Sequence, residues 1–296
     1  MKPRTELFIT GTLLLYTLCC QSAWGARLAV LDFGETKTGR LAADRVAAAL
    51  KGEADLALVD RDAARAAALG VGYDGSLNMT LREARDLGAA IGCDFFLTGD
   101  AQVLRRNPST GPIYYEAYAS IFLVSTRTGR LLKWRRESFE AAQGEEAERR
   151  LLAWIDSGAW QASYLNMLRA AAEEERKLRL TPKDDETPIA EVPEEGSPEA
   201  LALRLPMPYR RLRPEYPETA ARAEAEATVD VTVDLDASGE VLRAEVVRWA
   251  GFGLDEAALG VVRQLHFRPA MRDGTPLPMR ILLRYNFRKP KRDEKR

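Results

Sequence analysis

Hydrophobic and polar positions alternate strictly in the C-terminal third of the chain. Residues 229–235 alternate valine or leucine with aspartate or threonine, and Ala237-Ser238-Gly239 then supplies a turn into a returning strand. Residues 254–265 carry apolar side chains at helical spacing, and residues 279–287 alternate again. This order predicts a ββαβ domain over residues 205–288, in which one helix covers a small antiparallel sheet.

The front of the chain, residues 26–143, switches repeatedly between buried-strand runs and helix-like patterns. Thr80, with Glu83 three residues later, forms a capping box at the start of one helix. The expected strands are residues 27–33, 54–61, 94–106, 114–126 and a run that begins near Arg130, and the expected helices are residues 39–51, 62–70 and 80–92. The order βαβααβββ predicts a mixed sheet with helices packed against it.

Two segments connect these domains. Residues 144–180 carry leucines and an isoleucine at helical spacing, so we expect a helical segment that packs on the front domain. Gly158 interrupts the pattern, which leaves one bent helix or two helices. Residues 181–204 are acidic, and a proline recurs every five or six residues up to position 198, which predicts a disordered linker with little to bury. The whole chain is therefore predicted to be an α+β protein.

The first 25 residues have the features of a cleaved secretory signal peptide. Lys2 and Arg4 precede a short apolar run, Leu7–Leu18, and Ala23-Trp24-Gly25 places small residues at −3 and −1 of a cut before Ala26. The run is shorter than the roughly 20 residues of a transmembrane helix. We therefore predict a periplasmic protein. The alternative is that this segment is kept as an inner-membrane anchor, which would bring membrane contact.

Charge and cysteine content bear on nucleic-acid binding, lipid anchoring and disulfide formation. The formal net charge of −1 over 296 residues gives no reason to expect a nucleic-acid partner. The basic tail, residues 289–296, is expected to be solvated. Cys19 and Cys20 lie in the predicted signal without the small preceding residue that lipid anchoring prefers, so lipidation is a second choice. After cleavage only Cys93 remains, which excludes an internal disulfide and is expected to be buried.

The motifs that resemble sites of chemistry lack their necessary partners. Gly70–Gly75 spells a dinucleotide loop but follows a helix, and Gly34–Gly39 has phosphate-loop spacing without the lysine and hydroxyl that should come next. His266 is the only histidine, and it stands at a helix end. The acids Asp230, Asp234 and Asp236 share one strand face without further ligands, so they are expected to be its solvated face. We therefore predict no catalytic, metal or cofactor residues, and no cofactor.

The C-terminal domain resembles the TonB C-terminal domain. The resemblance begins at Pro214-Glu215-Tyr216-Pro217 and a short helix, TAARAEA, and continues through ATVDVTVDLDASGEV, a strand, a glycine turn and a second strand. It ends with LGVVRQLHFRPAMRDGTPLPMRILLRYNF, a helix, an aromatic-x-Pro-Ala step and a last strand. One departure is Ala227, where many members have glycine.

This resemblance implies a non-enzymatic protein whose edge strand accepts a short segment of an outer-membrane or other envelope protein. The physical basis is β-augmentation, in which unpaired backbone groups of an edge strand supply affinity. The residues that it implies for partner binding are Tyr216, Pro217, Arg280, Leu282, Arg284 and Asn286. Tyr216 either contacts the partner or only anchors the entry to the domain.

The front domain resembles the periplasmic α/β domain of CsgG-type proteins and of the TolB amino terminus. The phrases that carry this looser resemblance are RLAVLDF, DLALVDR, ARDLGAAIGCDFFLTGDAQV and IFLVSTRTGRLL. It implies a protein-binding domain of the bacterial envelope.

Two alternative functions remain at this point. An energy transducer for transport across the outer membrane would keep an anchor with a functional histidine, which Leu7–Leu18 lacks, and a longer proline-rich span than this linker. An envelope enzyme that binds a nucleotide at Gly34–Gly39 is the weaker alternative.

Overall fold

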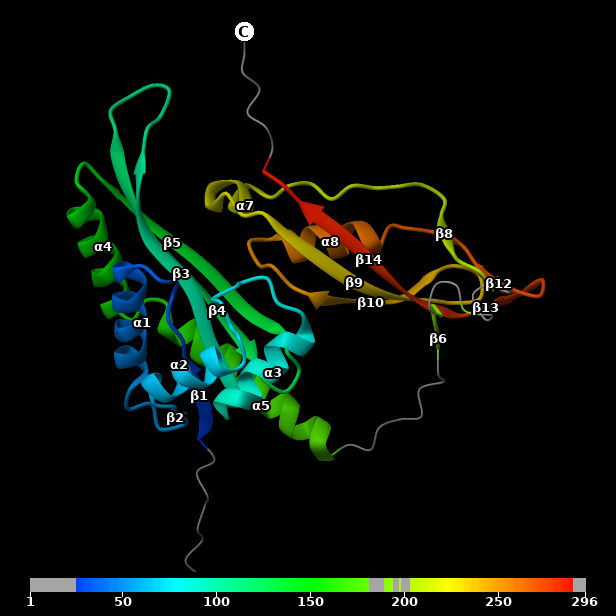
Figure 1. Ribbon diagram of the computed structural model, residues 1–296, viewed down its shortest axis with the longest axis horizontal. Coiled ribbons are helices and arrows are strands. Elements are labelled where there is room, and N and C mark those ends of the chain that lie inside the picture. The colour runs from blue at the N-terminus through cyan, green and yellow to red at the C-terminus, as the bar shows by residue number, and fades with distance from the viewer. Residues whose placement is uncertain (1–24, 181–188, 194–196, 198–202, 290–296) are drawn as a thin grey trace, which may run out of the picture.

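The computed structural model describes residues 25–180, 189–193, 197 and 203–289. The predicted signal peptide up to Trp24, most of the predicted linker and the tail from Pro290 lie outside these residues. Figure 1 shows the front domain and the C-terminal domain side by side, with the C-terminal sheet to the right of the front sheet.

The front domain is built on one five-stranded sheet in the order β2-β1-β3-β4-β5. Its strands are β1 (Ala26–Val30), β2 (Leu56–Leu58), β3 (Phe95–Arg106), β4 (Tyr114–Ser125) and β5 (Leu131–Ala141). β1 is parallel to β2 and β3, whereas β3, β4 and β5 are antiparallel neighbours. The predicted mixed sheet is confirmed, and β5 is one of its edges.

Helices cover both faces of this sheet. They are α1 (Lys37–Leu50), α2 (Arg61–Gly70), α3 (Leu81–Ile91), α4 (Gly144–Asp156) and α5 (Gln161–Leu180). α1, α4 and α5 share one buried apolar cluster with the sheet, and α2 and α3 share the other. Gly158, with φ +68°, separates α4 from α5, so the helical segment is two helices packed on the front sheet. The capping box of Thr80 and Glu83 starts α3 as predicted.

The C-terminal domain contains the predicted ββαβ unit with short additions. Its main elements are α7 (Glu218–Ala223), β9 (Ala227–Leu235), β10 (Val241–Arg248), α8 (Leu254–Val262) and β14 (Met279–Phe287). The main sheet has the order β10-β9-β14-β6, where β6 (Ala190–Glu191) comes from the linker. Small sheets add β7 (Leu203–Arg204), β8 (Met207–Pro208), β11 (Phe267–Arg268), β12 (Ala270–Arg272) and β13 (Thr275–Leu277).

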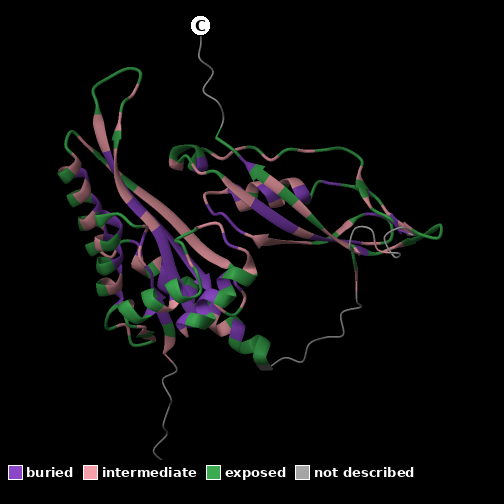
Figure 2. Cartoon of the chain, viewed as in Figure 1, coloured by how far each residue is buried: buried purple, intermediate pink, exposed green. Residues whose placement is uncertain are grey.

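The core of the C-terminal domain lies between its sheet and its helices. Val229, Val231, Val233 and Leu235 of β9 pack with Leu254 and other buried residues of α8. Figure 2 shows that much of β9 is buried, as are long stretches of β3 and β4 in the front sheet. The alternation of β9 therefore places its valines in the core as the sequence predicts.

Candidate binding edge

The last strand, β14, has one paired edge and one largely open edge. All nine residues of β14 pair antiparallel with β9, from Met279 opposite Leu235 to Phe287 opposite Ala227. On its other side, the pairing is with β6 alone, at Met279 and Arg280. Residues 281–287 have no strand on this outer side anywhere in the described part of the chain. An edge of this kind is a template for a further strand.

The strand on the other side of β9, β10, meets the front domain. The backbone N–H of Trp249 donates to the carbonyl oxygen of Met79 at 3.0 Å, and Arg248 forms an isolated β-bridge with Thr80. The Arg130 guanidinium also donates to Glu245 Oε1 at 2.9 Å. The front domain therefore lies against one edge of the C-terminal sheet.

The loop Trp249–Gly253, directly after β10, joins the two domains; we call it the aromatic loop. Trp249 is 2% exposed, and its indole N–H donates to the Gly129 carbonyl at 2.9 Å. The Phe122 ring stacks on Trp249 at 6.1 Å between centroids and meets Phe252 edge-on at 5.4 Å. Gly251 has φ +71°, and a Cβ there would lie 2.5 Å from the Phe122 ring, so only glycine fits. These contacts bury apolar surface that each domain alone would expose to water.

A single asparagine bridges the domains with three hydrogen bonds. The side-chain amide of Asn78 donates to the carbonyls of Thr228 at 2.8 Å and Trp249 at 2.7 Å. Its amide oxygen accepts the Thr228 N–H at 3.2 Å. Asn78 therefore satisfies backbone groups at the start of β9 and at the end of β10 that the interface would otherwise leave unpaired.

A half-buried carboxyl group, that of Asp255, holds the loop Trp249–Gly253 in shape. Asp255 accepts hydrogen bonds from the backbone N–H groups of Ala250 at 2.9 Å and Gly251 at 2.8 Å. Burial raises the pKa of Asp255 to about 6, although the two backbone hydrogen bonds oppose this shift. The charge state of Asp255 is therefore coupled to the loop that joins the domains.

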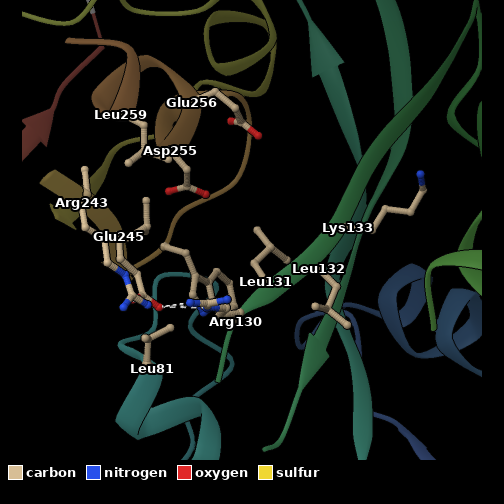
Figure 3. Close-up of a pocket in the computed structure, with 13 residues that line it drawn as sticks. Leu81, Arg130, Leu131, Leu132, Lys133, Arg243, Glu245, Asp255, Glu256 and Leu259 are labelled. Carbon is tan, nitrogen blue, oxygen red and sulfur yellow. Dashed lines mark hydrogen bonds and ion pairs between the residues drawn. The ribbon is translucent and has the colours of Figure 1, made fainter. Parts of the chain in front are cut away.

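A groove of about 360 Å³ lies beside this interface, between the start of β5 and the outer side of β10 and α8. Figure 3 shows Arg130 and Glu245 facing each other there, with Asp255 and Glu256 on the α8 side. The charges in the groove have both signs and Arg130 is already paired. No group of three or more metal-ligating side chains occurs in the described ranges.

Two of the six residues predicted to bind a partner anchor the start of the domain. The Tyr216 hydroxyl donates to the Ala225 carbonyl at 2.7 Å, which ties the residues before α7 to those after it. Pro217 is the residue before the first turn of α7, with φ −65°. The contacts of Tyr216 therefore fit the anchoring role, and its contact with a partner stays a prediction.

The other four predicted residues share one face of β14. Arg280 donates two hydrogen bonds to Asp234, at 2.6 and 2.9 Å, and Arg284 donates two to Asp230, at 2.7 and 2.9 Å. Asn286 accepts a hydrogen bond from the Thr228 hydroxyl at 2.8 Å. Leu282, between the two arginines, is 55% exposed.

The prediction that Asp230 and Asp234 form a solvated strand face is wrong. These side chains are buried, at 4% and 5% exposure, because arginines of the neighbouring strand cover them. Two hydrogen bonds from each arginine satisfy the carboxylate oxygens at this low exposure. Asp236 differs, because it binds backbone N–H groups in the turn that follows β9.

The glycine loop at Gly34–Gly39 uses its own backbone donors internally. Thr36 accepts the Gly39 N–H at 2.9 Å through its hydroxyl, and its carbonyl accepts the Arg40 N–H at 3.1 Å. One of the first amides of α1, which a phosphate would need, is thereby occupied by the cap. His266 pairs with the Glu240 carboxylate at 2.9 Å on the surface, and Cys93 is buried as predicted.

Docking of the two domains on each other is a feature that the sequence patterns did not predict. The available signal was the stretch Trp249-Ala250-Gly251-Phe252-Gly253, two large aromatic residues among glycines immediately after a strand.

No helix in the described part of the chain has the length and apolar character needed to cross a membrane.

Comparison with known proteins identifies the C-terminal domain. The family model described as Gram-negative bacterial TonB protein C-terminal matches residues 213–288. Protein TonB of Vibrio cholerae serotype O1 is 32% identical over 79 residues, which is 26% of this chain and 32% of that protein. The chain thus spans about a third of the length of this curated relative.

Solved structures give weaker similarities. The LpoB C-terminal domain from Salmonella enterica is 17% identical, with 39% of this chain and 82% of that chain covered and a TM-score of 0.28. A PelC dodecamer structure from Paraburkholderia phytofirmans is 14% identical, with 44% and 86% covered and a TM-score of 0.27. Such TM-scores support no conclusion, and the resemblance of the front domain to CsgG-type and TolB domains stays a prediction.

The family match includes the whole ββαβ unit, from Ala227 to Phe287. Residues 213–288 therefore match the TonB C-terminal domain family, and the similarity to Protein TonB is limited to this part of the chain.

Proposed function

We propose that this chain is a non-enzymatic envelope protein that binds a protein partner by strand pairing along the outer edge of β14. TonB-family proteins are associated with the bacterial envelope. The observation that carries the proposal is the difference between the two ends of the C-terminal sheet. The front domain lies against β10, whereas residues 281–287 of β14 lack an outer strand in the described structure.

The partner of this edge is an extended segment of an outer-membrane or other envelope protein. Backbone hydrogen bonds would give the affinity, and side chains on the faces of β14 would give selection. Leu282 is the exposed apolar side chain on the face that also carries Arg280 and Arg284. Because both arginines are held by buried aspartates, we expect Leu282 to select an apolar neighbour in the bound segment and the arginines to keep β14 straight and paired.

A backbone-modified peptide tests strand pairing without altering the protein. The chain from Ala26 to Arg296 is titrated with peptides from the plug segments of outer-membrane receptors. The best binder is then compared with two N-methylated forms of the same sequence. One is methylated at the odd-numbered residues and the other at the even-numbered residues. Strand pairing predicts that one methylated peptide binds at least about tenfold more weakly than the unmodified peptide, because it has lost the N–H groups that donate to β14. The other methylated peptide should bind about as tightly as the unmodified one. Absence of binding by every peptide, or equal binding of both methylated forms, would contradict the proposal.

The mature N-terminus decides between a periplasmic adaptor and an anchored energy transducer. We expect N-terminal sequencing of the exported protein to begin at Ala26, since small residues stand at −3 and −1 of that bond. A protein that retains Leu7–Leu18 would instead support the anchored alternative.

A further inference from the structure

The outer edge of β14 already carries a short strand from the chain's own linker. Ala190 and Glu191, which form β6, pair in parallel with Met279 and Arg280. Composition alone predicts that this acidic, proline-rich stretch has no partner. Its pairing has a simple cause: the backbone groups of an open edge accept a strand whatever its side chains.

We propose that residues 189–192 are a resident occupant of the binding edge, which an external segment must displace for full pairing with β14. This inference rests on the proposed function, because it concerns the same edge. The occupant lowers the apparent affinity for a partner, since only molecules with β6 detached offer the whole strand. The linker thereby regulates the binding edge within one chain.

The extent of the occupant is limited by proline. If the parallel register continued, Val192 would come opposite Ile281 and Pro193 opposite Leu282. Pro193 has no N–H to donate, so the ladder cannot continue through it, and Val192 is already 41% exposed. In the sequence Pro188 stands on the other side, so the occupant is confined to four residues between two prolines.

This limit makes the occupant displaceable. An incoming segment can first pair along residues 282–287, where no outer strand lies in the described part of the chain, and then replace β6 at Met279 and Arg280. The competition is intramolecular, and a short tether gives the occupant an effective concentration on the order of millimolar. A two-residue ladder can therefore influence binding although it would not persist between separate molecules.

Substitutions in the linker change the occupant without touching β14. Replacing both paired residues, with Ala190→Pro and Glu191→Pro in one protein, removes the N–H donor of β6 whichever of the two residues directs it at β14. Pro193→Val restores a donor and lets the ladder lengthen. Glu191→Gln is the matched control, because it keeps the backbone and removes only the charge opposite Arg280.

The probe is a fluorescent peptide of residues 186–193 in which Pro188→Thr and Pro193→Thr supply the missing donors. It is titrated against the four forms of the chain from Ala26 to Arg296, and hydrogen exchange of the segment containing Met279 and Arg280 is followed in each. Relative to the parent chain, we expect binding about fivefold tighter for the double proline variant and about threefold weaker for Pro193→Val, with Glu191→Gln within about twofold. Without peptide, exchange at Met279 and Arg280 should be faster in the double proline variant.

The possible results separate this inference from the proposed function. Equal peptide affinity for all four proteins, or unchanged exchange at Met279 and Arg280 in the double proline variant, would overturn the resident occupant while strand binding at β14 still stands. Failure of the peptide to bind even the double proline variant, together with faster exchange there, would leave β6 as a covering strand but reject β14 as a binding edge.

Discussion

The two long strands that flank β9 in the C-terminal sheet, β10 and β14, have opposite surroundings. β10 runs into the aromatic loop at Trp249, which is buried against Phe122 and the Gly129 carbonyl of the front domain. β14 carries only the two-residue β6 on its outer side in the described residues. One side of this sheet is therefore used for contact with the front domain, whereas most of the outer side of β14 carries no strand in the described residues.

The largest expected loss of stability comes from removing the indole of Trp249, which packs between β10 and the front domain. Trp249→Ala should destabilise the chain by about 3–5 kcal/mol, because it leaves a cavity beside Phe122 and removes the hydrogen bond to Gly129. Chemical denaturation measures this loss, and hydrogen exchange should rise in β10 and near Met79 but not in the middle of β14. Trp249→Phe is the control that keeps a ring and removes the donor, and its cost should be smaller. An equal rise of hydrogen exchange in β10 and in β14 would contradict the claim that only β10 depends on contact with the front domain.

The half-buried carboxyl group of Asp255 should make the stability of the interface between the two domains sensitive to pH. Its pKa is raised from the ordinary value of 3.8 to about 6 in the fold, so between these values the folded chain binds a proton that the unfolded chain releases. Stability from this group is therefore complete below pH 3.8 and is lost as the pH rises through about 6, by at most about 3 kcal/mol.

Asp255→Asn tests this linkage directly. The variant loses one of the two backbone hydrogen bonds, at Ala250 or Gly251, and it cannot titrate. The advantage of the parent chain over the variant in denaturation experiments should shrink as the pH rises from about 4 to about 7. An advantage that grows over this range would mean that the charged form is the one stabilised by the loop.

The smallest of these effects concerns the arginine pairs on β14. Arg280→Ala should cost about 2 kcal/mol, because it leaves the buried Asp234 carboxylate without its two hydrogen bonds. Adding Asp234→Val should restore most of that stability, since no buried charge then remains. If the single variant is as stable as the parent but binds partner peptides weakly, Arg280 is a contact residue and its pairing with Asp234 is incidental.

Local patterns predict the elements of both domains well. The capping box at Thr80, the break at Gly158 and the alternation of residues 229–235 are all set by neighbours in sequence, and each is found where expected. The docking of the domains could not be found in this way, because it joins residues such as Asn78 and Trp249, which lie 171 positions apart.

For the candidate site, local patterns predict the strand but not its contacts. Alternation along β9 tells which residues face away from the valines, but not that Arg280 and Arg284 cover Asp234 and Asp230. Composition likewise predicts an unpartnered linker, because it contains no information on the open backbone edge that Ala190 and Glu191 meet.

Hydrogen exchange of the chain from Ala26 to Arg296, with and without a bound receptor-derived peptide, tests the central claim most directly. Binding at the β14 edge predicts slower exchange in residues 281–287 and unchanged exchange in residues 241–248 of β10. Slower exchange confined to β10, or no change in β14 at saturating peptide, would contradict the account.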